Sequence, residues 1–246
     1  MADLCDEYLK LHADQKKSRS FFEWTVAVLE RHFKETLLSE ITPRDVEEFL
    51  SARRRDAKTA TANRSLTVLK HMFRKAIEWG YARENPVATF KPEKERNRRE
   101  FFLTKDQAED FLTNACDRIR PVVLAALHTG ARRGELLALT WTDVDIRRRL
   151  LAFRDTKNGE DRIVKMSERL AAALRALPRP LRGGHLFGTV DGAALEATTL
   201  RTDFERAVNK AGLTGFLFHD LRHSAASFLV QAGVPLNTVR QTSLSR

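Results

Sequence analysis

Apolar residues recur at helical spacing through the first part of the chain, which predicts helices that bury one face. The predicted helices cover residues 3–11, 21–33, a segment that begins at Thr42 and Pro43, and 59–79. Thr42 is suited to cap its helix, and Pro43 fits the first turn, where no backbone N–H is needed. The apolar face expected for the last helix consists of Leu66, Leu69, Phe73 and Ile77.

The second part of the chain mixes helical patterns with two short strands. Helices are expected over residues 104–116, 121–128, 167–177 and 198–211. Residues 150–153 and 162–166 are expected to be strands, and Lys157-Asn158-Gly159 between them is a strong signal for a hairpin turn. The fold class that follows is mainly α with a small antiparallel β-sheet, an α+β protein.

A charged segment separates the two parts. Residues 91–100 carry charged and polar side chains around a single proline, which is typical of a linker. We therefore expect a helical domain over residues 1–90, a linker over 91–100 and a second domain over 101–246.

The composition favours a negatively charged partner. Of the 246 residues 42% are hydrophobic, which suffices for a packed core, while the net charge is +10 and the pI is near 9.9. A soluble basic protein would carry the same charge, so the clustering of basic residues is more informative. For the run 51–58 we weigh DNA contact and a solvated loop equally. The basic side chains expected to contact DNA phosphates are Arg53, Arg54, Arg55, Lys58, Arg64, Lys70, Arg74 and Lys75.

Cysteine usage and apolar runs argue against other classes. Cys5 and Cys116 lie far apart, and neither belongs to a Cys-x-x-Cys pair, which argues against a disulfide framework or a cysteine metal site. We find no signal-peptide pattern and no apolar run of about 18 residues, the length of a membrane span. We expect a protein of the cytoplasm of a bacterium or a phage host, with no membrane partner.

Candidate chemistry begins at residues 129–135, Thr-Gly-Ala-Arg-Arg-Gly-Glu. Arg132 follows a glycine turn and precedes a leucine-rich helix, so its guanidinium can reach into a cleft. This group suits a phosphodiester because its planar fork donates two parallel hydrogen bonds. Further along, His219 and Arg222 are three residues apart and would be neighbours on a helix. Glu135 either orients an arginine through a salt bridge or forms an ordinary surface pair.

These segments, in this order, resemble the tyrosine recombinases, or phage-type integrases. Residues 129–135 are similar to the family's arginine box, and 139–145 to the Leu-x-Trp-x-Asp-x-Asp sequence that follows it. Lys157 matches the family's β-hairpin lysine, and residues 219–222 match its His-x-x-Arg box. The resemblance implies a helical core-binding domain and a catalytic domain that grip duplex DNA as a C-shaped clamp. It also implies DNA integration, excision or resolution through a phosphotyrosine intermediate, without a metal or nucleotide cofactor.

The resemblance assigns a role to each matching side chain. Arg132 and Arg222 would neutralise the nonbridging oxygens of the phosphate, and Lys157 would be the general acid. His219 would bond the phosphate or hold the nucleophile. A zinc site is the alternative for His219 and His223, which are spaced i, i+4. The glutamate of the His-Glu-x-x-His motif is lacking and an arginine lies between the two histidines, so we expect no metal.

The family's second histidine or tryptophan and its nucleophilic tyrosine have no counterpart after the His-x-x-Arg box. The two tyrosines are Tyr8 and Tyr81, and no histidine follows His223. We therefore expect a C-terminally incomplete catalytic domain that binds double-stranded DNA and does not cleave it. Other recombinase protomers are a further expected partner, since some family members receive the tyrosine from a neighbour. Two alternatives stay open: a non-enzymatic DNA-binding regulator that competes with an intact integrase, and the product of a decayed, frameshifted gene.

Overall fold

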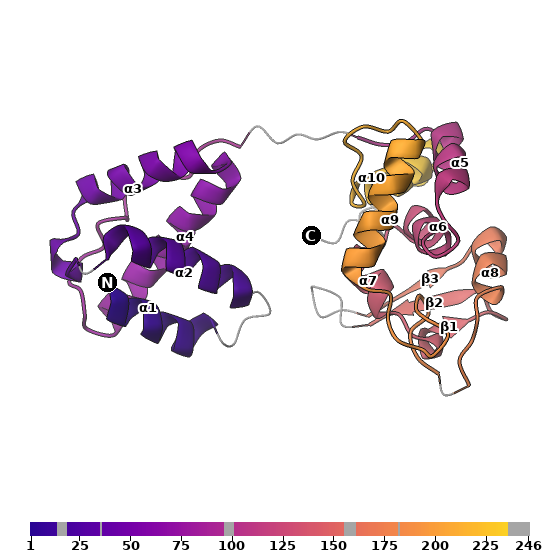
Figure 1. Cartoon of the computed structure of the whole chain (residues 1–246), viewed down its shortest axis with the longest axis horizontal. Helices are drawn as coiled ribbons and strands as arrows, with labels where there is room; N and C mark the ends of the chain where they lie inside the picture. The colour runs from indigo at the N-terminus through magenta and orange to yellow at the C-terminus, as the bar shows by residue number, and fades with distance from the viewer. Residues whose placement is uncertain (14–18, 35, 96–100, 155–160, 182, 236–246) are drawn as a thin grey trace. The chain divides into compact units, whose positions relative to one another are not determined.

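A computed structural model of the chain describes residues 1–13, 19–34, 36–95, 101–154, 161–181 and 183–235. The chain divides into two compact units, residues 1–98 and 99–246 (Figure 1). Helices dominate both units, and the second also contains a small antiparallel sheet. The predicted α+β class is therefore confirmed.

The first unit consists of packed helices. In chain order its elements are α1 (Ala2–Tyr8), a π-helical turn (Leu9–Ala13), α2 (Arg19–Phe33), a 3-10 turn (Leu38–Glu40), α3 (Pro43–Asp56) and α4 (Thr59–Glu78). The long helix α4 packs against α1, α2 and α3 and so joins the other helices into one body. The core contains Leu4, Tyr8, Val26, Leu29, Val46, Phe49, Leu69 and Phe73.

The start of α3 follows directly from the local sequence. The Thr42 side chain accepts a hydrogen bond from the backbone N–H of Asp45, and the Asp45 carboxylate accepts one from the backbone N–H of Thr42 at 2.7 Å. This capping box, with Pro43 in the first turn, confirms the predicted helix start. On α4, however, the predicted apolar face is wrong at Ile77. That side chain is exposed because Met72, Phe73 and Ala76 occupy the buried positions of the last turns.

The chain that follows α4 is tied back to the first unit at Glu93. The backbone N–H of Glu93 donates to Oδ1 of Asn63 at 2.9 Å, and its carbonyl accepts from Nδ2 of the same residue at 2.9 Å. The Glu93 carboxylate lies 2.7 Å from Nε of Arg54. Glu93, which belongs to the predicted linker, is thus held by both α3 and α4.

The second unit surrounds a small sheet with helices. The helices are α5 (Lys105–Asn114), α6 (Arg120–Thr129), α7 (Arg133–Ala138), α8 (Glu168–Arg175), α9 (Ala197–Lys210) and α10 (Asp220–Gln231). A 3-10 turn (Trp141–Asp143) leads into the strands β1 (Val144–Asp145), β2 (Leu150–Phe153) and β3 (Arg162–Lys165). The strands are antiparallel in the order β1-β2-β3, and Leu151 lies opposite both Val144 and Val164.

The two predicted strands are confirmed as β2 and β3, whereas β1 was not predicted. With two residues, β1 is too short to show an alternating pattern in the sequence. The turn predicted at Lys157-Asn158-Gly159 lies outside the described residues.

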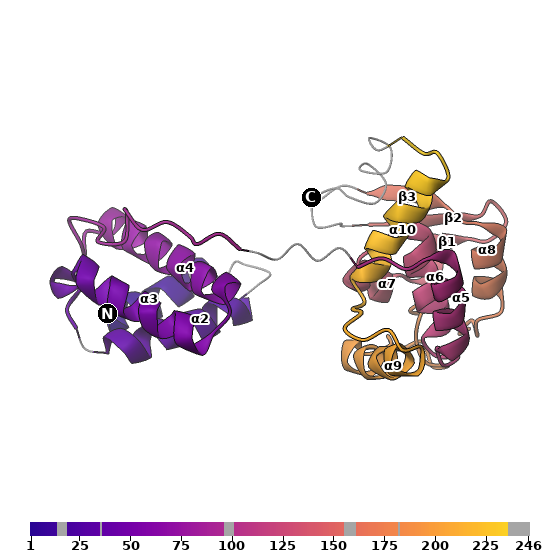
Figure 2. The same cartoon turned by 90° about the horizontal axis from the view of Figure 1, so that it is seen from above.

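The helix α6 forms the centre of the second unit, where it packs against α5, α7, α8 and α10. Both views show the sheet between α7 and α8 (Figures 1 and 2). A capping box of Thr104 and Gln107 begins α5, and the Ser167 side chain caps α8, at the starts of two helices that the sequence predicts. None of the helices in the described part of the chain combines the length and the apolar character of a membrane span.

Candidate functional site

The arginine box folds around the turn that joins α6 to α7. Gly130 ends α6 with a φ of 62°, a left-handed conformation that glycine adopts without steric cost. Arg132 then takes the N-cap position of α7. One turn later, the Glu135 carboxylate accepts a hydrogen bond from the backbone N–H of Arg132 at 2.9 Å and another from its guanidinium at 2.8 Å. The first residues of α7 thereby fix both the backbone and the side chain of Arg132.

Glu135 is a buried carboxylate. Its side chain is 10% exposed, so its contact with Arg132 is better shielded from water than an exposed ion pair. Burial alone would raise the pKa of Glu135, but the hydrogen bonds from Arg162 and Arg132 outweigh burial, so the pKa lies below its ordinary value. Glu135 is therefore a carboxylate at neutral pH.

A second guanidinium reaches Glu135 from the sheet. Nη2 of Arg162, the first residue of β3, lies 2.7 Å from Oε2 of Glu135. The guanidinium of Arg162 also lies over the ring of Phe153, with its central carbon 4.6 Å from the ring centroid. Arg162 is not among the residues predicted from the sequence. The only available signal was an arginine beside a predicted hairpin, and its partner lies 27 residues away.

Arg222 comes from α10 and is almost completely buried, with 5% of its surface exposed. Its Nη1 donates to the carbonyl oxygen of Gly130 at 2.6 Å. Ser224 ties α10 to the start of the unit, because its hydroxyl accepts from the backbone N–H of Leu103 at 2.9 Å. The same hydroxyl donates to the carbonyl of Asp220 within α10 at 2.8 Å. The packing of α10 on α6 thus brings the His-x-x-Arg segment to the arginine box.

The arginines at this site act on each other. Burial, together with the nearby charges of Arg132 and Arg162 and against the opposing charge of Glu135, lowers the pKa of Arg222 to about 10. A positive charge is therefore costly at Arg222. An anion placed between Arg222 and Arg132 would relieve this repulsion, so the site is suited to bind a negatively charged group.

His219 stands at the N-cap of α10, and its ring is perpendicular to that of His223 at 5.1 Å between centroids. Burial, and then the charges of His223 and Arg222, lower the pKa of His219. The ring is therefore neutral at pH 7 and is able to donate one hydrogen bond and accept another. Within the described ranges, no three side chains of His, Cys, Asp or Glu lie close enough to hold a metal ion together.

Three of the predicted residues, Arg132, His219 and Arg222, line one cavity of about 540 Å³. Its remaining wall comes from α7, α9 and the segment that precedes α10. The residues of that wall are Ala131, Arg133, Gly134, Leu200, Arg201, Phe204, Glu205, Phe216, Leu217 and Phe218. Glu135 bonds Arg132 without lining the cavity. Lys157 lies outside the described residues.

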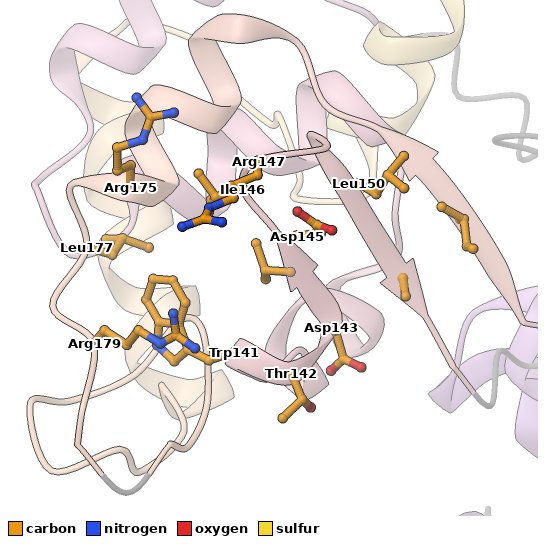
Figure 3. Close-up of a pocket in the computed structure, with 13 residues that line it drawn as sticks. Trp141, Thr142, Asp143, Asp145, Ile146, Arg147, Leu150, Arg175, Leu177 and Arg179 are labelled. Carbon is orange, nitrogen blue, oxygen red and sulfur yellow. The ribbon is translucent and has the colours of Figure 1, made fainter.

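A further cavity of about 780 Å³ lies beside β1 and the chain that follows α8 (Figure 3). Figure 3 shows Arg147, Arg175 and Arg179 near Leu177 on one side. Asp143 and Asp145 also line this cavity. Positive and negative side chains thus nearly balance there. This cavity contains none of the predicted phosphate-binding residues, so it is a weaker candidate for an anion site.

In the first unit, Arg53 differs from the prediction that it contacts DNA. Arg53 is buried, and its guanidinium lies 5.2 Å from the ring centroid of Trp24. It occupies the inward face of α3, one helical turn after Phe49 and Leu50. The prediction took the arginine run as a unit, although only part of it faces outward.

The other basic residues of the first unit lie at or near the surface. Arg54 is paired with Glu47 at 3.1 Å and with Glu93 at 2.7 Å. Nζ of Lys70 donates to the carbonyl of Ala88 at 2.9 Å, and Lys75 forms an ion pair with Glu78. The exposed side chains among those predicted to contact DNA are Arg54, Arg55, Lys58, Arg64 and Arg74.

Comparison with known proteins covers both units. The family described as Phage integrase central domain matches residues 2–93, and Phage integrase family matches residues 101–243. The chain is 25% identical to a putative integrase/recombinase of Haemophilus influenzae, over 93% of this chain and 77% of that protein. It is 29% identical to the shufflon-specific DNA recombinase of Escherichia coli, over 98% of this chain and 64% of that protein.

Among solved structures, the chain shares its fold with a lambda integrase (75–356) dimer bound to a COC′ core site. The TM-score is 0.84, with 20% sequence identity over 100% of this chain and 94% of the other. At this level of identity the likeness concerns the fold alone.

Proposed function

Because this chain belongs to the phage integrase family of tyrosine recombinases, we propose that it binds duplex DNA as a site-specific recombinase does. One phosphodiester would lie between Arg132 and Arg222. The observation that carries this proposal is the convergence of Arg132, His219 and Arg222 on one cavity, with Arg222 buried beside other positive charges. A phosphate in this cavity would offset the positive charges of Arg132 and Arg222.

Each group in the cavity suits a pentavalent phosphate. The guanidinium forks of Arg132 and Arg222 donate to the nonbridging oxygens, where negative charge grows in the transition state. Each such donor contributes about 3 kcal/mol in comparable oxyanion sites. His219, neutral at pH 7, donates its N–H to an oxygen of the same phosphate.

Lys157 is the proposed general acid for the 5′-hydroxyl leaving group. A lysine suits this role when neighbouring positive charge lowers its pKa enough for it to release a proton. Support comes from the flanking strands: β2 ends at Phe153 and β3 begins at Arg162, whose guanidinium lies over the Phe153 ring and bonds Glu135.

The first unit would supply contacts to the phosphate backbone. Exposed basic side chains add affinity and fix register, but they do not read sequence. We propose this role for Arg54, Arg55, Lys58, Arg64, Lys70, Arg74 and Lys75. Of these, Arg54, Lys70, Arg74 and Lys75 would exchange a partner in the protein for a phosphate. Arg53 is withdrawn from this set because it is buried. We further propose that more than one copy binds a DNA site, since the lambda integrase neighbour is a DNA-bound dimer.

Cleavage of a phosphodiester also requires a nucleophile. The tyrosines of the chain are Tyr8 and Tyr81, and both lie in the first unit. The Tyr8 hydroxyl bonds Nδ1 of His71 at 2.9 Å, and burial raises the pKa of Tyr8 to about 12, so it is a poor nucleophile. This observation favours a second candidate: these 246 residues bind a recombination site without cleaving it and so compete with an intact integrase.

Two measurements on the full chain test both candidates. Fluorescence anisotropy with genomic duplexes that the chain selects should show affinity that falls steeply with salt and weakens in Arg132→Ala and Arg222→Ala. Equal affinity for these variants, or no DNA binding, would contradict the phosphate site. A nicked duplex that traps covalent intermediates decides between the candidates. A covalent protein–DNA adduct indicates cleavage, and its absence with normal binding supports the competitor.

A further inference from the structure

A single carboxylate connects the sheet to the arginine box. Oε1 of Glu135 accepts from Nη1 of Arg132 at 2.8 Å. Oε2 accepts both the backbone N–H of Arg132 at 2.9 Å and Nη2 of Arg162 at 2.7 Å. The orientation of the carboxylate therefore depends on residues from two separate elements, α7 and β3.

We infer that Arg162 is a positioning residue for Arg132, acting through Glu135. The inference rests on the proposed function in that Arg132 is taken to contact the phosphate. Arg162 donates a hydrogen bond to Oε2 of Glu135 from the sheet and so helps to fix the rotation of the carboxylate. The fixed carboxylate in turn holds the backbone and the guanidinium of Arg132. Without Arg162, only Arg132 itself still bonds the carboxylate, which is then less firmly held, and Arg132 loses part of its fixed direction.

Arg162 is itself held in place. Its guanidinium lies over the ring of Phe153, which is buried at 1% exposure, and the Arg162 side chain is 15% exposed. A planar guanidinium is able to stack on a ring and donate to a carboxylate at once, which a lysine ammonium does less well. A rigid support of this kind is what a binding group needs to keep its productive geometry.

The burial of Arg162 argues against a purely stabilising role. Its Nε is buried and has no hydrogen-bond partner within the described residues. A buried donor without a partner opposes folding, and an apolar side chain of similar size would fill the same space without that penalty. The site thus holds a costly third guanidinium, which is expected where charge and direction matter for binding.

The first test uses the full chain without DNA. In Arg162→Met, hydrogen exchange of the Arg132 backbone N–H should become about tenfold faster or more, the size expected for coupled neighbours. A carbon NMR titration should also show the pKa of Glu135 rising toward its ordinary value. Arg162→Lys keeps the positive charge and should therefore show smaller changes in both the exchange rate and the pKa. An Arg132 amide that exchanges as in the unchanged chain would overturn the inference.

Arg169→Met is the matched control for this test. Arg169 also forms a bidentate ion pair, with Glu109, but both side chains are exposed and neither lines the cavity. This variant should change neither the Arg132 amide nor the pKa of Glu135. Thermal melting of each variant shows whether the second unit is still folded.

The second test is a double-mutant cycle in DNA affinity. Arg132→Met, Arg162→Met and the double variant are compared on one duplex at one salt concentration. If Arg162 acts through Arg132, its loss weakens binding by about tenfold, and the double variant binds no worse than Arg132→Met. Losses that add would overturn the inference, because they mean a direct DNA contact by Arg162. If the unchanged chain binds no DNA, the proposed function fails, while the DNA-free test still decides the role of Arg162.

Discussion

Arginine–carboxylate pairs within hydrogen-bond distance occur in both units but in different surroundings. On α3, Nε of Arg44 lies 3.3 Å from the Glu48 carboxylate, and the side chains are 87% and 62% exposed. In the second unit, Glu135 meets Arg132 and Arg162 at 2.8 and 2.7 Å and is 10% exposed. At the surface, water solvates both charges and salt screens them, so the pair contributes little. Water reaches little of the Glu135 carboxylate, so its partners in the protein must provide the interactions that water would otherwise provide.

The surroundings of an ion pair, more than its contact distance, thus set how much the pair contributes to the free energy of unfolding. Removing one side of an exposed pair leaves a charge that water already stabilises. Removing one side of the Glu135 cluster leaves buried charges without compensation. The second unit should therefore be sensitive to single changes at this cluster, and the surface of the first unit should tolerate them.

Glu135→Ala should have the largest effect, because Arg132, Arg162 and Arg222 would then lie together without their carboxylate. We expect the free energy of unfolding of the second unit to fall by about 3 kcal/mol. Urea denaturation followed by Trp141 fluorescence, with the other two tryptophans replaced by phenylalanine, measures this loss. Glu109→Ala is the control, because its pair with Arg169 is exposed, and it should lose less than about 1 kcal/mol. Equal losses would break the comparison.

Arg222→Lys should have the next largest effect, on DNA affinity. Lysine keeps the charge but lacks the fork that donates to Gly130 and to a phosphate together. We expect binding to weaken by about tenfold or more, the value of a hydrogen bond to a charged group. Arg64→Lys on the exposed face of α4 should bind within about twofold of the unchanged chain, since a surface contact needs only the charge. Anisotropy titrations at fixed salt compare the two variants.

Acid should destabilise the two units at different pH values. Burial, followed by the charges of His12 and Arg74, lowers the pKa of His71 to about 4. Between about 6.5 and 4 the unfolded first unit therefore binds more protons, so its stability is full above about 6.5 and falls with pH through this window. The pKa of Glu135 is also lowered, so its contribution is full above about 4.3 and is lost as pH falls below that value.

Single-tryptophan variants separate these two transitions. Trp24 or Trp79 reports on the first unit, and Trp141 reports on the second. As pH is lowered, the urea midpoint of the first unit should fall before that of the second. In His71→Leu, the midpoint of the first unit should fall less between about pH 6.5 and 4. An unchanged pH profile in His71→Leu would show that His71 is not its source.

Glu48→Gln should have the smallest effect. Its pair with Arg44 is an exposed i, i+4 contact, so the free energy of unfolding of the first unit should change by less than about 0.5 kcal/mol. The same urea series measures it. A loss as large as that of Glu135→Ala would mean that exposure does not decide the contribution of these pairs.

The sequence predicted the features that depend on neighbours in the chain. The helix starts at Thr42 and Thr104 depend on side chains within three residues of each start. The order of helices and the strands β2 and β3 follow from periodicity, which is also local. The arginine box and the His-x-x-Arg segment were found through residue types and order, and the fold then placed Arg132, His219 and Arg222 on one cavity.

The features that the sequence did not predict depend on distant packing. Arg162 reaches Glu135 only because β3 pairs with β2 beside α7, and no local pattern states that pairing. Arg53 belongs to a basic run, but its helical position turns it inward onto Trp24. Ile77 fits an apolar face by spacing, yet Met72 and Ala76 fill the core in its place. In each case tertiary packing overrides a local pattern.

The contact between Arg222 and Gly130 also bears on how the chain folds. It joins residues 92 positions apart, and the bond between Ser224 and Leu103 joins residues 121 positions apart. Contacts of such long range form slowly, because the chain must lose much of its freedom before they add stability. During synthesis Gly130 leaves the ribosome well before Arg222, so the segment around Gly130 lacks this contact until α10 has been made. If the cavity binds a phosphate as proposed, that binding requires α10 to have docked, and a chain made only as far as α9 would lack it.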